Sequence, residues 1–468
     1  AQTILPANTL SGGYDVANSL RFNDGDSPAL TRSLGTTTLT TKGTFSFWVK
    51  RGQLGTAQII YSNEVADDNN RAFIQFEDDD TFRIKDTVSG SNTTFYATTQ
   101  KFRDVGAWYH MVVALDSTEA GGNRIRVYKN GTRIPDANFG TSTEPNQNSA
   151  FKLLTGGQTN KNHIGKIHGG ANHFDGYLAE FVYCDGQVLD ASSFGEFDED
   201  SPNVWKPISV SGLTMGDQGF YLDFEDSSAL GNDKAGSNNF GTVTNLAATD
   251  QSTDTCTNNF CTMNPLLGAL YTPTFTEGNL QVAQSNNNQH AITHGTFAVT
   301  KGVWYWEVKY IGNTGTSGPS DRAVGIQTPN VTNVFTQATY NGTGSVTYYG
   351  YDGGEVWDEG TATTADYGTY SQNSILGISL DMDNGVISFY INGTEVVDNY
   401  ALGTSASVIA TPAITWPNGT ASGTEMGVNF GSPFYALSSA VADANGYGAF
   451  EYTPVGYALC TKNLAEFG

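Results

Sequence analysis

Hydrophobic and polar residues alternate in short runs along most of the chain, a pattern typical of β-strands with one buried face. In residues 44–51, TFSFWVKR, the apolar side chains of Phe45, Phe47 and Val49 alternate with polar or amphipathic ones. Residues 302–310, GVWYWEVKY, alternate in the same way. Long stretches with the 3.6-residue apolar period of a helix are missing from the sequence. The pattern predicts an all-β protein made of antiparallel sandwiches.

Two segments of the chain share one sequence pattern of strands and turns. Residues 112–134 read VVALDSTEAGGNRIRVYKNGTRI, and residues 375–396 read ILGISLDMDNGVISFYINGTEV. Each has an apolar strand that ends in Leu-Asp, a turn rich in Gly and Asn, and a second strand that closes with Tyr-x-Asn-Gly-Thr. Asn-Gly between alternating strands predicts a type I′ hairpin, because both residues tolerate a positive φ. Two such meanders predict two β domains of related architecture, with function to be sought on their loops.

The spacing of strands and turns divides the chain into five parts. The segment between the two β domains is rich in Asn, Thr, Ser and Gly, so we expect a connector draped on a neighbouring domain rather than a separate core. The predicted parts are an N-terminal arm (1–18), a first sandwich (19–205), a loop-rich connector (206–270), a second sandwich (271–436) and a C-terminal tail (437–468).

Several strand motifs resemble known families. TFSFWVKR, WYHMVVALD, IRVYKNGTRI and FDGYLAEFVYCDGQVLDASSFGEF occur in the order expected of a laminin-G-like domain of the concanavalin A-like superfamily. GVWYWEVKY, RAVGIQT, VTYYGYDGGEVWDEG, the second meander and the closing NFGSPF together resemble a SPRY domain. These resemblances imply two concanavalin A-like jelly-roll sandwiches joined by a loop-rich connector.

The order of the parts carries a further resemblance. Laminin-G-like and SPRY units joined by connectors such as GFYLDFEDSSALGND and TNNFCTMNPL resemble fibre and capsid-decoration proteins of marine tailed bacteriophages. The resemblance implies a virion surface protein that contacts other virion proteins, forms a homo-oligomer (a trimer is our expectation) and adheres to host-surface glycans or proteins. A purely structural, capsid-stabilising decoration protein is the alternative within this group.

The charge and hydropathy of the chain exclude some partners. The formal net charge is −24, with 23 Lys and Arg against 47 Asp and Glu. A basic surface supplies most of the affinity for nucleic acids and anionic membranes, so we expect neither as a partner. No run of eighteen apolar residues occurs, and the first residues lack the pattern of a retained signal peptide. We therefore expect no membrane insertion.

The concanavalin A-like resemblance raises a carbohydrate-active hydrolase as the enzymatic alternative. Retaining glycosidases need two carboxylates about 5 Å apart. The run Glu196–Asp200 and the pair Asp223 and Glu225 come nearest to such a motif, but neither has the Glu-x-Asp-x-Glu pattern of the related glucanases. A Gly-x-Ser-x-Gly elbow and a metal-ligand spacing of histidines are both missing from the sequence. We therefore expect a protein that is not an enzyme.

Aromatic and acidic residues gather in the second sandwich, in a segment where SPRY domains bind partners through loops. Faces of Trp and Tyr stack on sugar rings, so this cluster of aromatics and carboxylates predicts a ligand site. Its members are Tyr348, Tyr349, Tyr351, Asp352, Trp357 and Asp358. Packing that belongs to the SPRY pattern itself is the alternative.

Two further features concern a cofactor and a cross-link. Laminin-G-like domains hold calcium with loop carboxylates, so the resemblance makes Asp78, Asp79 and Asp80 candidate calcium ligands, although the segment lacks EF-hand spacing. Solvated loop acids are the alternative. Cys256 and Cys261 are close enough in sequence for a local disulfide, and free thiols are the alternative that the spacing leaves open.

Overall fold

The computed structural model describes most of the chain as two compact units. The first unit is Leu10–Thr257 and the second contains Asn258–Gly468. The described residues are 13–35, 40–63, 69–155, 161–167, 169–266, 273–284, 291–313, 322–329, 344–350, 353–416 and 424–468. Within these ranges, no helix is long and apolar enough to cross a membrane.

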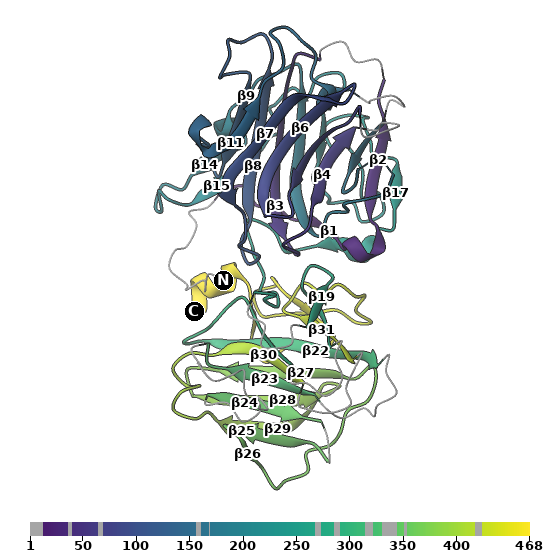
Figure 1. Ribbon diagram of the computed structural model, residues 1–468. Helices are drawn as coiled ribbons and strands as arrows, with labels where there is room; N and C mark the ends of the chain where they lie inside the picture. The colour runs from purple at the N-terminus through teal and green to yellow at the C-terminus, as the bar shows by residue number, and fades with distance from the viewer. Residues whose placement is uncertain are drawn as a thin grey trace. The chain divides into compact units, whose positions relative to one another are not determined.

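The first unit is a sandwich of two eight-stranded sheets (Figure 1). One sheet has the order β10-β9-β8-β3-β13-β1-β18, with β16 attached to β13. The other has the order β11-β7-β6-β5-β4-β12-β2-β17. The first sheet consists of β1 (Ser19–Phe22), β3 (Lys42–Arg51), β8 (Tyr109–Asp116), β9 (Ile125–Lys129), β10 (Thr132–Arg133), β13 (Gly176–Asp185), β16 (Phe220–Leu222) and β18 (Gln251–Ser252). The second consists of β2 (Ala29–Ser33), β4 (Gln58–Asn63), β5 (Ala72–Phe76), β6 (Thr81–Val88), β7 (Ser91–Lys101), β11 (Phe139–Thr143), β12 (Lys161–Ile164) and β17 (Thr242–Thr244).

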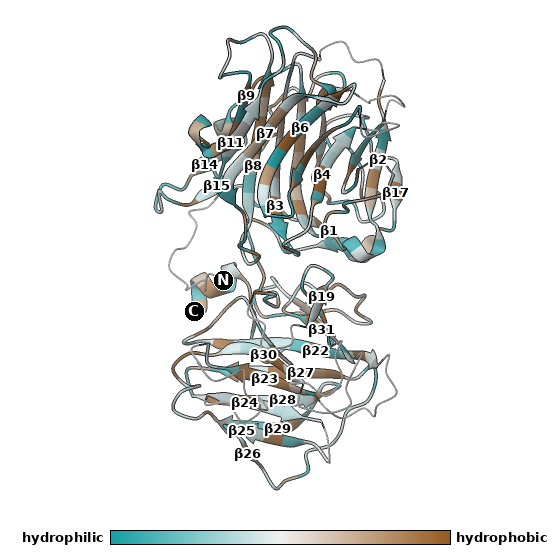
Figure 2. Cartoon of the chain, in the orientation of Figure 1, coloured by the Kyte–Doolittle hydropathy of each residue, from teal (hydrophilic) through white to brown (hydrophobic). Residues whose placement is uncertain are grey.

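Strand alternation places the core of this unit between its two sheets. Phe45, Phe47 and Val49 of β3 are fully buried in one cluster with residues of the opposite sheet such as Ile74. Trp48 points to the other face, where it joins a smaller cluster. Figure 2 shows the resulting change between hydrophobic and hydrophilic residues along the strands. The period-2 pattern therefore predicted the buried face of β3 correctly.

The segment predicted as a connector, 206–270, is divided between the two units. Three short strands in it complete the sheets of the first unit: β16 pairs with β13, β17 with β2, and β18 with β1. Phe220, Leu222 and Phe224 supply apolar side chains to the core of that unit. The boundary between the units lies after Thr257 rather than after residue 270. Sparse apolar residues are enough here, because each strand adds to an existing sheet.

The second unit contains an eight-stranded and a six-stranded sheet. The orders are β19-β20-β31-β22-β27-β28-β29, with β34 attached to β22, and β21-β30-β23-β24-β25-β26. The eight-stranded sheet consists of β19 (Thr274–Thr276), β20 (Gln281–Gln284), β22 (Val303–Asn313), β27 (Ile375–Asp381), β28 (Val386–Ile391), β29 (Thr394–Ala401), β31 (Thr424–Asn429) and β34 (Tyr457–Ala458). The six-stranded sheet consists of β21 (Ala291–His294), β23 (Ala323–Gln327), β24 (Ser345–Tyr349), β25 (Glu355–Asp358), β26 (Thr361–Ala362) and β30 (Thr411–Trp416). Trp304, Trp306 and Trp416 are buried in its core.

The predicted C-terminal tail, 437–468, is part of this second unit. It forms β32 (Val441–Ala442), β33 (Ala449–Phe450), β34 and α1 (Thr461–Phe467). Glu307 on β22 is fully buried and accepts hydrogen bonds from the backbone N–H groups of Glu451 and Tyr452, both at 2.9 Å. Phe260 forms an antiparallel bridge with Cys460, so the similar sequences around Cys261 and Cys460 lie side by side.

The two predicted meanders are β8–β9–β10 and β27–β28–β29, and their hairpins share a detailed geometry. Asn130 and Gly131 have φ values of 45° and 78°, and Asn392 and Gly393 have 48° and 76°, as the type I′ prediction requires. Asn130 Oδ1 accepts a hydrogen bond from the backbone N–H of His110, and Asn392 Oδ1 accepts one from that of Ile375.

Each hairpin glycine also lies against an aromatic ring from a later segment of its own unit. A Cβ atom at Gly131 would come within 2.3 Å of Trp205, and one at Gly393 within 2.5 Å of Tyr452. The Asn-Gly pairs therefore have two roles: they adopt the positive φ values of the turn, and their glycines allow an aromatic ring to pack closely.

Candidate functional site

A pocket of ≈ 410 Å³ lies in the first unit, in the size range of small-molecule sites. Three segments form it: the β9–β10 turn, the 3-10 helix η4 (Ala191–Ser193), and the hairpin of β14 (Gly195–Phe197) with β15 (Trp205–Pro207). We call it the Trp205 pocket. Its lining residues are Tyr128, Gly131, Asp190, Ala191, Ser192, Gly195, Glu196, Phe197, Trp205 and Ile208.

The β14–β15 hairpin sets two aromatic rings in contact. Phe197 is directly opposite Trp205 in the antiparallel register, and their rings meet edge to face at 4.9 Å. The turn between them is organised by Asp198, whose Oδ1 accepts hydrogen bonds from the backbone N–H groups of Asp200 and Ser201. Lys206 forms an ion pair with the other Asp198 oxygen at 3.2 Å. The aromatic pair is therefore fixed by local turn chemistry.

The indole of Trp205 is held between glycines and a buried histidine. A Cβ atom at Gly131 or Gly195 would lie 2.3 or 2.6 Å from indole carbons, so only glycine allows this close approach. Trp205 Nε1 donates a hydrogen bond to His110 Nδ1 at 2.9 Å, and His110 Nε2 lies 2.9 Å from Ser46 Oγ. Because Nδ1 accepts, the imidazole proton is on Nε2 and Ser46 is the acceptor of its hydrogen bond.

Burial keeps the His110 ring neutral. Desolvation lowers the pKa of His110 from 6.5 to about 3. A neutral ring with the proton on Nε2 is the form that can accept the Trp205 hydrogen bond, so the indole orientation is stable over the neutral pH range.

The polar groups of the pocket are mostly acceptors. Asp190 caps η4, where its Oδ1 accepts hydrogen bonds from Ser192 N at 3.1 Å and Ser192 Oγ at 2.6 Å. The Glu196 side chain is 57% exposed and lies 3.5 Å from Lys206 Nζ. Phe197 is 45% exposed. An exposed aromatic surface with carboxylates beside it can stack on a ring and accept hydrogen bonds from its hydroxyl groups.

Sequence reasoning did not predict this pocket as a binding site. In the sequence, Glu196–Asp200 stand out only as a weak match to a glucanase motif. The available signal was the pair of aromatic residues, Phe197 and Trp205, on either side of a turn-forming run. The contact of these two aromatic residues with the β9–β10 turn depends on tertiary structure and has no signal in the sequence.

The ligand site predicted in the second unit is split by strand alternation. Tyr348 points into the core, is fully buried, packs against Phe389 at 5.5 Å, and donates a hydrogen bond to the Gly368 carbonyl. Tyr348 is therefore a core residue and is not exposed to a ligand. Tyr349 and Trp357 lie on the other face, with their rings edge to face at 6.3 Å.

The remaining members of that predicted site are less informative. Asp358 is half-buried and accepts a hydrogen bond from Tyr400 at 3.4 Å. Burial and the neighbouring Glu359 raise the pKa of Asp358. Tyr351 and Asp352 lie outside the described residues. Of the four members that the structure describes, it brings together Tyr349 and Trp357, and their role in binding stays a prediction.

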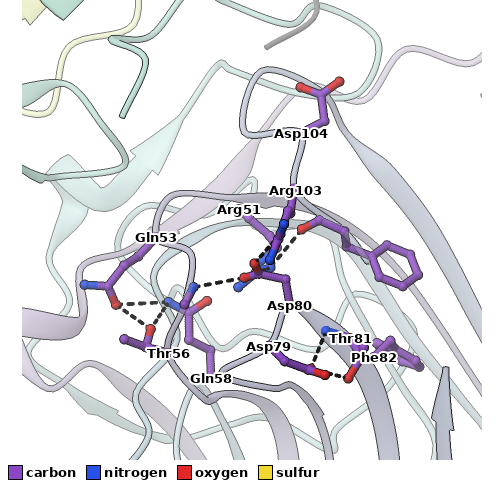
Figure 3. Close-up of polar contacts among 12 residues, drawn as sticks. Arg51, Gln53, Thr56, Gln58, Asp79, Asp80, Thr81, Phe82, Arg103 and Asp104 are labelled. Carbon is purple, nitrogen blue, oxygen red and sulfur yellow. Dashed lines mark hydrogen bonds and ion pairs between the residues drawn. The ribbon is translucent and has the colours of Figure 1, made fainter. Parts of the chain in front are cut away.

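The predicted calcium ligands do not converge on one point. Asp80 Oδ2 accepts from Arg103 Nε at 2.7 Å, and its Oδ1 accepts from Arg51 Nη1 at 3.1 Å and from the Gly55 N–H at 2.9 Å (Figure 3). Burial alone would raise the pKa of Asp80, but the Gly55 N–H and the two guanidinium groups outweigh it and lower the pKa.

The two acids before Asp80 lie at the surface of the same turn. Asp79 is exposed and accepts hydrogen bonds from Thr81 N at 3.0 Å and Thr81 Oγ1 at 2.6 Å, and Asp78 is exposed as well. In the part of the chain that the structure describes, no group of three acidic, histidine or cysteine side chains could hold a metal ion. Calcium binding stays a prediction, without support from the arrangement of these side chains.

Cys256 and Cys261 do not form the disulfide that their spacing allowed. Both are free thiols, as are Cys184 and Cys460. Cys256 packs in a small cluster of the first unit, near Trp48, whereas Cys261 is fully buried in the core of the second unit. The two side chains are thus directed into different cores despite their proximity in sequence.

The pair Asp223 and Glu225, considered as hydrolase carboxylates, shares one cation. Lys234 Nζ lies 3.0 Å from Asp223 Oδ2 and 3.2 Å from Glu225 Oε2. Asp223 is buried and also accepts from the backbone N–H of Glu225 at 3.2 Å. This arrangement is that of an ion-paired turn.

Comparisons with known proteins agree with the fold. Residues 23–191 match the family model described as the concanavalin A-like lectin/glucanases superfamily, and residues 303–428 match that of the SPRY domain. None of the curated proteins compared with the chain matches it. Domains of these two kinds fit an adhesion or binding role.

Three solved structures illustrate the similarity. Domains LG4-5 of the mouse laminin alpha1 chain are 10% identical, with coverage of 98% of both chains and a TM-score of 0.30. The SPRY domain of human HERC1 is 15% identical, with coverage of 36% of this chain and 96% of that chain and a TM-score of 0.29. A heptameric SAP-like pentraxin from Limulus polyphemus is 18% identical, with coverage of 45% and 94% and a TM-score of 0.28. The two family-model matches identify a laminin-G-type domain of the concanavalin A-like superfamily over residues 23–191 and a SPRY domain over residues 303–428, both folded as jelly-roll sandwiches.

Proposed function

We propose that the protein is a non-enzymatic adhesion protein that binds glycans in the Trp205 pocket. The observation that carries the proposal is the exposed Phe197 ring, held against Trp205 and flanked by Asp190 and Glu196. An aromatic surface beside carboxylates matches the two sides of a sugar, since one face of the ring carries C–H groups and its edge carries hydroxyl groups.

The rigidity of the pocket supports a binding role. Trp205 is fixed by two glycines and by the hydrogen bond to His110, so little side-chain entropy is lost when a ligand stacks on the pair. The carboxylates considered for hydrolysis, Asp223 and Glu225, are instead paired with Lys234. Hydrolysis of a glycan is therefore the less supported activity.

The proposed setting is the surface of a bacteriophage particle, either on a fibre or as a capsid decoration. The motif order of the two domains and the acidic charge of −24 support it. We propose that the chain forms a homo-oligomer, with a trimer as the expected state, and contacts other virion proteins. Many copies on one particle would raise the effective affinity of individually weak sites by about 10² to 10⁴.

A glycan array tests the binding proposal. Full-length protein should bind a subset of glycans, and Phe197→Ala should weaken that binding at least tenfold. Val408→Ala is the matched control, because Val408 is 65% exposed but lies in the second unit. Glycan binding that survives Phe197→Ala would place the site elsewhere, and no binding to any glycan would favour a structural decoration protein.

Two further measurements test the setting and the activity. The chain should co-purify with phage particles, and its absence from purified particles would contradict the virion proposal. Incubation with the bound glycan should release no reducing sugar. Release that is lost in Asp223→Asn or Glu225→Gln would instead identify a hydrolase.

A further inference from the structure

The charge of the Trp205 pocket limits the kind of glycan that it can accept. Asp190 and Glu196 are the charged residues among those that line the pocket, and both are acidic. Lysine, arginine and histidine are missing from the lining. Lys206 follows Trp205 in sequence, but its ammonium group lies between Asp198 Oδ2 at 3.2 Å and Glu196 Oε1 at 3.5 Å.

The two carboxylates are placed to accept hydrogen bonds at the mouth of the pocket. Asp190, Ser192 and Glu196 are all exposed. Ser192 Oγ already donates to Asp190 Oδ1, so the hydroxyl group helps to hold the acceptor in place. An ionised carboxylate can only accept, and a sugar hydroxyl can donate to it. A sugar carboxylate or sulfate has no proton to donate at neutral pH.

We infer that the Trp205 pocket takes neutral glycans and discriminates against glycans that bear carboxylate or sulfate groups. This inference rests on the proposed function and names the ligand class of the same site. A like charge near Asp190 or Glu196 is repelled. The acidic surface of the chain adds a longer-range repulsion that salt screens.

Matched oligosaccharides test the inference. Neutral oligomers of glucose, galactose and mannose would be compared by calorimetry with glucuronate, galacturonate and mannuronate oligomers of equal length and linkage. The best neutral oligomer should bind at least tenfold more tightly than its acidic counterpart at low salt. The Phe197→Ala variant should lose binding of the neutral oligomer.

A charge-neutral variant isolates the cause. In Asp190→Asn with Glu196→Gln, the preference for the neutral oligomer should shrink at least threefold. Each substitution keeps an oxygen acceptor at its position, and each single variant serves if the double variant does not fold. The midpoint of thermal unfolding verifies folding.

The possible failures are distinguishable. If the acidic oligomer binds as well as the neutral one and Phe197→Ala weakens both, the ligand class is wrong and the proposed function stands. If the preference is unchanged in the charge-neutral variants, the carboxylates are not its source and the inference is overturned. If no oligomer binds, the proposed function itself fails.

Discussion

Trp205 donates a hydrogen bond from Nε1 to Nδ1 of His110, 95 positions earlier in the chain, at a distance of 2.9 Å. The bond joins the hairpin that carries the Trp205 pocket to a central strand of the sheet. Because His110 is buried and its pKa is held at about 3, it accepts this bond as a neutral ring at all pH values of interest. The pocket is thereby anchored to β8, which lies between β9 and β3 in the sheet.

Replacement of Trp205 by Phe should cost stability and binding together. The substitution removes the indole donor and leaves His110 Nδ1 buried without it, at a cost of about 1–3 kcal/mol in the free energy of unfolding. Chemical denaturation of wild type and variant would measure the loss. Phe197→Ala is the control, since Phe197 is exposed and its removal should weaken glycan binding with a change in stability of about 0.5 kcal/mol or less.

Asp86 predicts a pH dependence of stability. Burial raises the pKa of this carboxyl group to about 7 from 3.8, although the Lys152 N–H and Thr94 hydroxyl bonds to Oδ2 oppose the rise. A raised folded-state pKa means that the unfolded state loses its proton first. The contribution of Asp86 to stability is therefore fully present below pH 3.8 and is lost as the pH rises to about 7.

The Asp86→Asn variant removes that dependence. It should be more stable than wild type by roughly 2–4 kcal/mol at pH 7.5, with the difference decreasing toward pH 4. Denaturation of both proteins at pH 4, 5.5 and 7.5 measures this difference in stability. The lowered pKa of His110 makes both proteins less stable as the pH falls, and this effect cancels when the two are compared. Equal stability at pH 7.5 would show that Asp86 is ionised without penalty.

The buried ion pair of Lys50 with Asp254 should hold the last residues of the first unit against strand β3. Lys50 Nζ lies 2.7 Å from Asp254 Oδ2, with both side chains almost fully buried, and Trp108 Nε1 donates to Asp254 Oδ1 at 3.1 Å. Asp254→Ala should lower stability by about 3–5 kcal/mol, because it removes the carboxylate that neutralises a buried ammonium group. Thermal unfolding, together with proteolysis of residues 242–257, would detect the loss.

An exposed ion pair in the same unit provides the control for the buried pair of Lys50 and Asp254. Arg133 and Asp136 are 3.1 Å apart, with side chains 36% and 58% exposed. Asp136→Ala should change stability by less than about 1 kcal/mol. Similar losses in both variants would contradict a special role for burial at Asp254.

Glu307 should hold the last part of the chain on the second unit. Its carboxylate accepts from the backbone N–H groups of Glu451 and Tyr452, and also from Asn429 Nδ2 at 3.3 Å. Glu307→Gln places an NH₂ group where one of these donors points, and it should cost about 1–3 kcal/mol. Hydrogen exchange at residues 449–452 should accelerate in this variant but not in Glu395→Gln, an exposed control on β29.

The sequence predicted the features that depend on local patterns. Alternation identified the inner face of β3, and Asn-Gly identified both hairpins, because each signal lies within a few neighbouring residues. The same alternation could have separated Tyr348 from Tyr349, but only the strand register shows which of the two faces the core. The strands β16, β17 and β18 within the predicted connector could not be recognised from the sequence, because their few apolar residues complete sheets whose main strands lie far away in the sequence.

The Trp205 pocket depends on still longer-range contacts. Its walls come from the β9–β10 turn, η4 and the β14–β15 hairpin. Phe197 and Trp205 are visible as an aromatic pair, but the close packing of Gly131 on the indole follows only from the completed sandwich. In the sequence, Glu196 belongs to a run that weakly matches a glucanase motif. In the structure, Glu196 and Asp190 are hydrogen-bond acceptors beside an aromatic surface.

The paired hairpins have a consequence for chemical durability. Asn-Gly is the dipeptide most prone to deamidation, in which the glycine nitrogen attacks the asparagine side-chain carbonyl. Asn130 and Asn392 each exchange two hydrogen bonds with an adjacent strand, through Oδ1 and through the backbone N–H. Trp205 and Tyr452 also crowd the two glycines. We therefore expect both dipeptides to age slowly in the folded protein and quickly in unfolded chains, so that isoaspartate at these positions records past unfolding.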